Sequence, residues 1–351
     1  MIQVSECIEK LSSADESERI YAAEDIGYAN EASGVPALLA RLPIEPSRAV
    51  AEAIVASLAQ IDSDCVVSGV IEWLDSDDAF VRNQAVEILR KRGGPAITYL
   101  ERAFRQGRAD RRKFVIDVLA RLPETSACGI YEAALLDSDL NVVIAAVESL
   151  GDFRQRSFQS KIESLVQSEA HPMLLCACLE ALAQIGDPNS PAVVRARLGG
   201  ASQLPGYLLA SYMKLLGVAG EPTDVAEIAD TIGRDGFEAP ALNALTSLRN
   251  RYPGLKLPQR VTAPLIAIIR RGEPTFLGYQ AVRLLAALMD DNSVFQFVES
   301  CLENAEKTIR MGAIQSMREA GGERGNAVIR RAMAAETDSE VLQAAGIRGG
   351  A

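Results

Sequence analysis

The chain has 351 residues, of which 48% are hydrophobic but only 5% aromatic. Its apolar content is mostly Ala, Leu, Val and Ile, which suits closely packed helices, because strands favour aromatic and β-branched residues. The net charge of −11 at pH 7 argues against general nucleic-acid binding. The single histidine excludes a metal site built from several histidines.

Nothing in the sequence directs the chain to a membrane or out of the cell. The first ten residues, MIQVSECIEK, lack a basic region followed by an apolar core, so we expect no signal peptide. No run of about 18 apolar residues occurs, so we expect no membrane span. The six cysteines are scattered through apolar stretches and are typical of small buried side chains in a reducing compartment. We therefore predict a cytoplasmic protein.

A recurring phrase predicts one helix in each of a series of repeats. Each copy has Asp, Ser or Pro near its start, which suits a helix N-cap, and then apolar residues at i, i+3, i+4 and i+7. The two clearest copies are 74–86, with the letters LDSDDAFVRNQAV, and 136–147, with LDSDLNVVIAAV. Weaker copies lie at 15–27, 171–186, 306–321 and 337–344.

A second apolar segment follows each of these helices after a short turn. Examples are 66–74 and 193–198. Equivalent positions recur every 29 to 36 residues, and neither helix of such a pair can bury its apolar stripe alone. The sequence therefore predicts an all-α fold, an α-solenoid of about ten stacked helical hairpins and a terminal half-repeat from Asp338.

We expect one solenoid over residues 1–351, with its most regular repeats in 1–200. Residues 201–275 are rich in Pro and Gly, and their units are longer. This segment predicts a bend or an irregular pair of repeats. Residues 276–351 are expected to hold the C-terminal repeats and the terminal half-repeat.

The phrases at Leu74–Ala85 and Leu136–Ala146 resemble the HEAT-repeat family, particularly the short bacterial type related to phycobilin lyase subunits. The resemblance extends over about residues 12–347. It implies a right-handed superhelix of helix pairs in which the second helix of each pair lines the concave side, and it implies binding of a partner protein there.

Charge is distributed unevenly along the chain. Residues 1–78 contain 16 acidic and 4 basic residues, whereas 79–113 contain 3 acidic and 10 basic residues. The second segment contains five arginines that we call the arginine cluster. They predict a binding surface for an acidic protein segment or a phosphate group. The alternative is a solvated face that neutralises the neighbouring acidic repeats. The cluster consists of Arg102, Arg105, Arg108, Arg111 and Arg112.

Trp73, the only tryptophan, is the second candidate for partner binding. It lies on a second helix at the margin of the apolar stripe. Trp73 is therefore either part of the edge of the core or an exposed anchor for a partner peptide or helix.

No catalytic, cofactor or metal site is predicted. Cys176 and Cys178 lie two residues apart on a helix and face opposite ways, so with His171 they do not form a zinc site. The acidic strings at 75–78 and 137–139 lack the glycine and the distal glutamate of a calcium loop. Their recurrence at the repeat period indicates helix capping.

The sequence thus favours a non-enzymatic scaffold or adaptor that grips a partner protein along its concave face. We expect no nucleic acid and no membrane among its partners. Two alternatives stay open: a lyase-like or chaperone-like subunit that assists bilin attachment to another protein, and an antitoxin-like or regulatory inhibitor of a basic partner.

Overall fold

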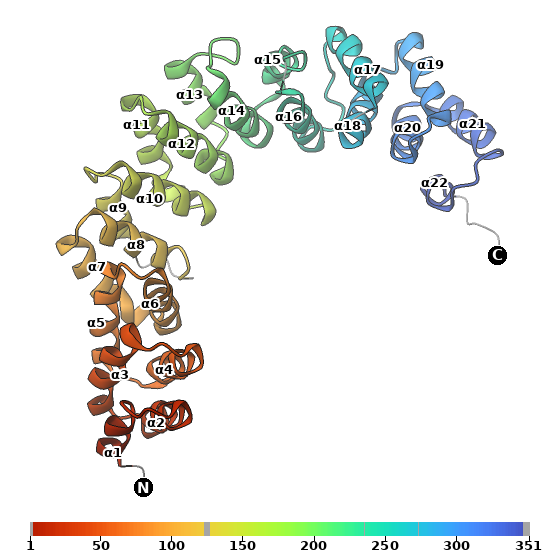
Figure 1. The fold of residues 1–351 in the computed structure, drawn as a ribbon. Helices are drawn as coiled ribbons and strands as arrows, with labels where there is room; N and C mark the ends of the chain where they lie inside the picture. The colour runs from red at the N-terminus through yellow and green to blue at the C-terminus, as the bar shows by residue number, and fades with distance from the viewer. Residues whose placement is uncertain (1–2, 123–126, 235, 273, 347–351) are drawn as a thin grey trace. The chain divides into compact units, whose positions relative to one another are not determined.

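The computed structural model describes residues 3–122, 127–234, 236–272 and 274–346. Every regular element in these ranges is an α-helix or a 3-10 helix (Figure 1). This confirms the predicted all-α solenoid of helical hairpins. The chain forms two compact units, unit 1 at Met1–Leu150 and unit 2 at Gly151–Ala351.

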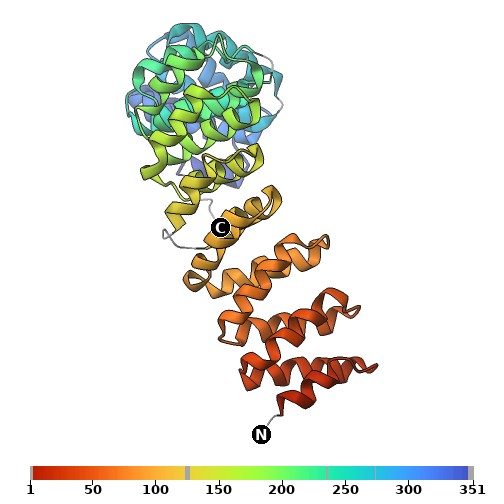
Figure 2. The same ribbon diagram turned by 90° about the vertical axis from the view of Figure 1, so that its left-hand side faces the viewer.

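Unit 1 is a stack of helices in two rows (Figure 2). Even-numbered helices pack on even-numbered ones, as α2 does on α4 and α4 on α6, while α3, α5 and α7 form the other row. The helices are α1 (Val4–Lys10), α2 (Glu16–Ala29), α3 (Val35–Arg41), α4 (Arg48–Gln60), α5 (Asp64–Glu72), α6 (Ala79–Arg92), α7 (Ile97–Gln106), α8 (Ala109–Leu119), α9 (Cys128–Ala134) and α10 (Leu140–Asp152), whose last two residues belong to unit 2.

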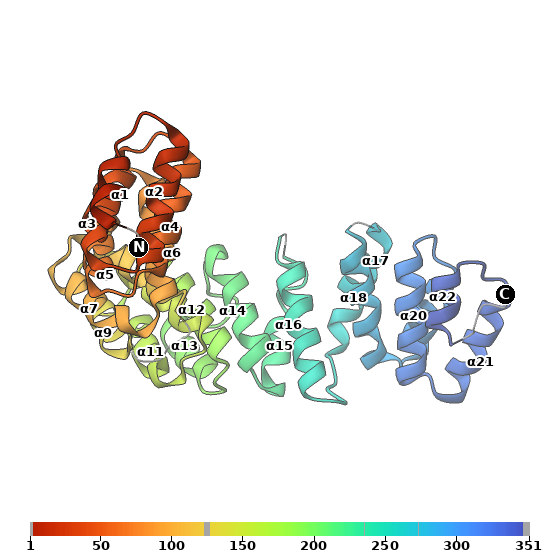
Figure 3. The ribbon, with the colours of Figure 1, turned by 90° about the horizontal axis from the view of Figure 1, so that it is seen from below.

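Unit 2 continues the two-row pattern and is curved (Figures 1 and 3). The irregular segment at 201–275 keeps its helix pairs, although α15 has only five residues. The helices are α11 (Gln159–Ser168), α12 (Pro172–Ile185), α13 (Ser190–Leu198), α14 (Gly206–Ala219), α15 (Val225–Ala229), α16 (Glu238–Arg251), α17 (Thr262–Arg271), α18 (Thr275–Leu285), α19 (Asn292–Ser300), α20 (Lys307–Ala320), α21 (Gly322–Met333) and α22 (Ser339–Ala344).

The inner row of unit 2, as we call α12, α14, α16, α18, α20 and α22, lies on the inside of this curve (Figure 1). These are the first helices of their pairs, whereas the resemblance implied that second helices line the concave side. Glycines allow the inner helices to approach closely. A Cβ on Gly217 of α14 would lie 2.9 Å from the Ala244 Cα atom of α16, and one on Gly278 of α18 would lie 2.6 Å from the Ile309 Cδ1 atom of α20.

The acidic strings cap helices, as predicted. Asp78 accepts a hydrogen bond of 2.7 Å from the Phe80 amide at the start of α6, and Asp139 accepts one of 2.9 Å from the Asn141 amide in the first turn of α10. Asp15, Asp291 and Asp338 do the same at α2, α19 and α22. Each carboxylate satisfies backbone donors that a helix leaves unpaired at its first turn.

Buried arginines brace successive hairpins. Arg19 donates to both oxygens of Glu45 at 3.0 Å and to the carbonyls of Ser13 and Ala14. Arg112 with Asp137 and Arg310 with Glu336 form the same arrangement. In these pairs the carboxylate lies 25 or 26 residues after the arginine in the chain. Burial raises the pKa of Glu45, but the Arg19 and Arg41 guanidinium groups and the Ser47 amide outweigh it, and that pKa is lowered overall.

Candidate functional site

Arg111 and Arg112 of the arginine cluster are bound within the protein. Arg111 donates to Glu72 at 2.9 Å and to Asp75, and these hydrogen bonds raise its pKa. Arg112 donates to both Asp137 oxygens at 2.6 and 2.7 Å. Both guanidinium groups are mostly buried, with 15% and 20% of the side chains exposed. They neutralise neighbouring acidic groups, but they do so as mostly buried side chains and not on a solvated face.

The rest of the cluster is more accessible. Arg105 is exposed and forms an ion pair of 2.6 Å with Glu101, one turn earlier on α7. Arg102 and Arg108 are exposed, and within the part of the chain that the structure describes neither has a hydrogen-bond or ion-pair partner. Arg102 and Arg105 line an open hollow of about 320 Å³ beside Thr98. Of the five arginines of the cluster, all in described ranges, Arg102 and Arg108 are therefore the ones that offer unpaired guanidinium groups to a partner.

Trp73 lies in the 3-10 turn Trp73–Asp75 that follows α5, and only 8% of it is exposed. Val70 and Ile71 at the end of α5 are buried as well. This placement favours the core interpretation of Trp73 over the anchor interpretation, because a buried ring has little surface to offer a partner.

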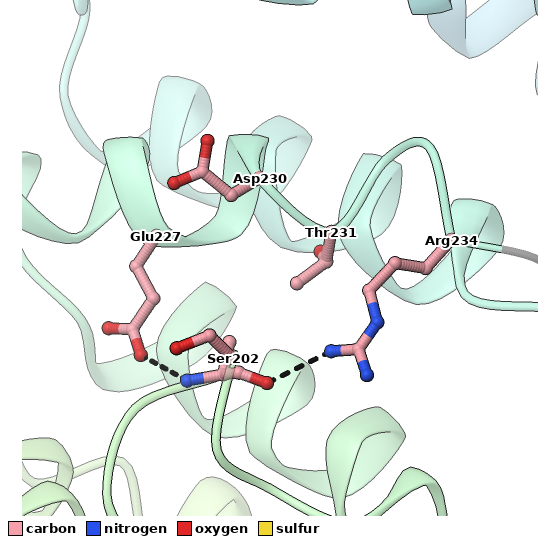
Figure 4. Close-up of a pocket in the computed structure, with 6 residues that line it drawn as sticks. Ser202, Glu227, Asp230, Thr231 and Arg234 are labelled. Atoms are coloured by element: carbon pink, nitrogen blue, oxygen red, sulfur yellow. Dashed lines mark hydrogen bonds between the residues drawn. The ribbon is translucent and has the colours of Figure 1, made fainter.

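A polar hollow of about 500 Å³ lies beside α15 in unit 2 (Figure 4). Its charged groups hold the loop that precedes α14. Glu227 accepts the Ala201 amide at 2.6 Å, and Arg234 donates to the Ala201 carbonyl at 3.0 Å. Glu227 also accepts the buried Tyr212 hydroxyl at 3.3 Å, and burial together with this carboxylate raises the pKa of Tyr212. The arrangement serves to fix the loop.

A second hollow, of about 610 Å³, lies between α16, α18 and α20 of the inner row. We call it the inner-row hollow. Arg249 and Arg283 share the carboxylate of Glu319 on its wall, and Tyr279 donates to Gln315 at 2.8 Å. Its residues are Thr246, Arg249, Asn250, Pro253, Gly254, Tyr279, Gln280, Arg283, Leu284, Gln315 and Glu319.

Apolar side chains are exposed along one edge of the inner row. Met173, Tyr207 and Phe276 are 64%, 52% and 54% exposed, and each is the second residue of its helix, α12, α14 and α18. The same position of α16 holds Ala239. The second residue of each of these four consecutive inner helices is therefore apolar, and we call the three exposed ones, Met173, Tyr207 and Phe276, the apolar edge.

Sequence reasoning missed both inner-row features. Their signal is positional, because Met173 and Tyr207 lie 34 residues apart and Thr246 and Gln280 also lie 34 apart. A comparison of equivalent positions in successive repeats would have found them. Among the described residues, no group of three His, Cys, Asp or Glu side chains is placed to hold a metal ion.

The comparisons with known proteins agree with the repeat architecture. A family model described as HEAT repeats matches residues 4–90 and 35–120. The match is to HEAT repeats in general, so the finer resemblance to bacterial phycobilin lyase subunits stays a prediction. No curated protein matches the chain. In the described ranges, no helix has the length and apolar character needed to cross a membrane.

Proposed function

We propose that this chain, whose residues 4–120 match HEAT repeats, is a non-enzymatic scaffold that binds a partner protein along the inner row of unit 2. HEAT repeats are generally protein-interaction scaffolds. The apolar edge is the observation that carries the proposal. Single exposed apolar residues are common on proteins, whereas Met173, Tyr207 and Phe276 are each the second residue of an inner helix, on α12, α14 and α18.

The inner row is suited to binding because it is held rigidly. Its helices pack on one another and on the outer helices, so few groups need to be ordered when a partner docks. Charges on this row are paired within the protein, as Lys214 is with Glu180 and Arg283 with Glu319. Exposed aromatic side chains such as Tyr207 and Phe276 provide the kind of contact that dominates binding energy.

The proposal is tested with a double substitution in the apolar edge. The tagged full-length chain is used to capture proteins from its native host, and the captured protein is then purified and its Kd measured. We expect Tyr207→Ser with Phe276→Ser to weaken binding by about 30-fold or more, since a hot-spot residue contributes about 2 kcal/mol.

The matched control removes apolar side chains elsewhere that are at least as exposed as Tyr207 and Phe276. Ile44 and Leu136 of unit 1 are 70% and 87% exposed, so Ile44→Ser with Leu136→Ser makes a comparable change in surface hydrophobicity. Equal affinity of both double variants for the partner would remove the inner row from the proposal. A failure to capture any protein through this surface would contradict the proposed function itself.

A further inference from the structure

Two aromatic side chains project into solvent from α2 in unit 1. Tyr21 and Tyr28 are 65% and 70% exposed, and the exposed Glu24 lies between them in the sequence. Residues at i, i+3 and i+7 share one face of a helix, and we call Tyr21, Glu24 and Tyr28 the tyrosine face. The opposite side of α2, with Ala23 and Ile26, is buried in the packing of unit 1. The tyrosine face is therefore available to a partner.

The two rings are placed to act together. A rise of 1.5 Å per residue separates the Tyr21 and Tyr28 Cα atoms by about 10 Å along the helix. Neither hydroxyl has a hydrogen-bond partner in the described ranges of the chain, so the protein itself does not hold these side chains. Tyrosine is enriched among the residues that contribute most to binding energy at protein interfaces, because its rigid ring contacts a partner at little cost in entropy.

The charge around this face identifies the partner. Residues 1–47 contain nine acidic and three basic residues. Two of the three basic residues, Arg19 and Arg41, are bound to the buried Glu45 and do not compensate the acidic surface. Glu24 has no ion-pair or hydrogen-bond partner among the residues that the structure describes. The tyrosine face therefore lies in a negative potential that attracts a basic partner.

We infer that the tyrosine face binds a basic segment of a partner protein, with lysine or arginine side chains on the two rings and Glu24 paired with one of them. A cation over a tyrosine ring is attracted by the electrons of the ring. An extended chain rises about 3.3 Å per residue, so basic residues three positions apart in such a segment reach both rings. An acidic segment would be repelled, and an apolar helix would bury Glu24 without a partner.

The inference concerns unit 1, and it does not rest on the proposed binding along the inner row of unit 2. Its test uses the full chain and three pools of dodecapeptides that carry a neutral dye. The variable positions are drawn from Arg, Lys, Gly and Ser in the basic pool, from Asp, Glu, Gly and Ser in the acidic pool, and from Asn, Gln, Gly and Ser in the neutral pool. Fluorescence anisotropy measures the affinity of each pool.

We expect the basic pool to bind about tenfold or more tightly than the neutral pool at low salt, and the acidic pool to bind least. The advantage of the basic pool should decrease as salt screens the exposed charges. Charge attraction to a chain with a net charge of −11 would give the same ranking without the rings, so the decisive measurement uses variants that keep the charge.

The double variant Tyr21→Ser with Tyr28→Ser removes both rings and leaves the net charge unchanged. It should weaken binding of the basic pool about tenfold, as the loss of two exposed cation–π contacts predicts. Phenylalanine at both positions keeps the rings and should retain binding. Serine and tyrosine have similar helix propensities, so the urea midpoint followed by Trp73 fluorescence should stay the same in the serine variant.

The matched control is Tyr207→Ser with Phe276→Ser, which removes two exposed aromatic side chains from unit 2. It should leave binding of the basic pool unchanged. Equal binding of the three pools, tighter binding of the acidic or neutral pool, or an unchanged affinity of the Tyr21→Ser, Tyr28→Ser variant would each overturn the inference. None of these outcomes bears on the proposed function, which depends on Tyr207 and Phe276.

Discussion

Glu45 is the best place to test the arginine bracing, because its side chain is completely buried. Its two oxygens accept hydrogen bonds from Arg19, from Arg41 at 2.7 Å and from the Ser47 amide at 2.9 Å. The Arg19 and Arg41 side chains are only 8% and 19% exposed. The substitution Glu45→Gln keeps the size of the side chain but removes the negative charge that both guanidinium groups share.

The expected loss of stability is large because two cations stay buried without a counter-charge. Breaking a buried ion pair by removing one partner costs about 3–5 kcal/mol. We expect Glu45→Gln to lower the free energy of unfolding by about 3 kcal/mol, at the lower end because the glutamine carbonyl still accepts one hydrogen bond. The matched control is Glu52→Gln. It breaks the ion pair between Glu52 and Arg48, whose side chains are 63% and 85% exposed, respectively. Exposed pairs of this kind contribute about 0.3–0.5 kcal/mol to stability.

Urea unfolding followed by tryptophan fluorescence measures this difference. Trp73 is the only tryptophan of the chain and lies buried in unit 1, so its emission reports on that unit alone. A midpoint shift with unchanged slope gives the change in stability. If Glu45→Gln destabilised unit 1 by no more than Glu52→Gln does, the ion pair would add nothing to hairpin stacking and the reasoning would be refuted.

Three further predictions concern acid stability, packing and charge. The pKa of Asp137 is lowered, so its contribution to stability is present at neutral pH and is lost as the pH falls below about 4; an Asp137→Asn variant should flatten this acid loss in a denaturation series. Gly27→Ala should destabilise unit 1 by about 1–3 kcal/mol despite the better helix propensity of alanine, because the new Cβ would lie 2.7 Å from the Ser57 hydroxyl; an unchanged urea midpoint would contradict this. Reversal of Arg102 and Arg108 to glutamate should leave the melting temperature unchanged, as neither has a partner, and should reduce the affinity of an acidic partner; equal affinity in low salt would remove the arginine cluster from binding.

The sequence predicted the helix pairs well because their signals are local. The aspartates at 15, 78 and 139 cap helices whose first turns follow them directly, and the apolar periodicity lies within single helices. Whether an arginine of the cluster is paired within the protein depends on residues far away along the chain. Arg111 contacts Asp75 and Glu72, which are 36 and 39 residues away. No local pattern distinguishes such an arginine from the exposed Arg108.

The residues of the candidate site occupy the positions of the inner helices that do not pack against other helices. An inner helix contacts a neighbour on either side and the outer row behind it, so only a narrow strip, about one residue per turn, faces solvent. On α18 this strip runs from Phe276 through Gln280 to Arg283. Because the strips of neighbouring helices lie side by side, a residue in one repeat meets its equivalent about 34 residues away, as Lys214 of α14 meets Glu180 of α12. Binding chemistry in this chain is therefore assembled across repeats, and substitutions in one strip can change the ligand without disturbing the helices that carry it.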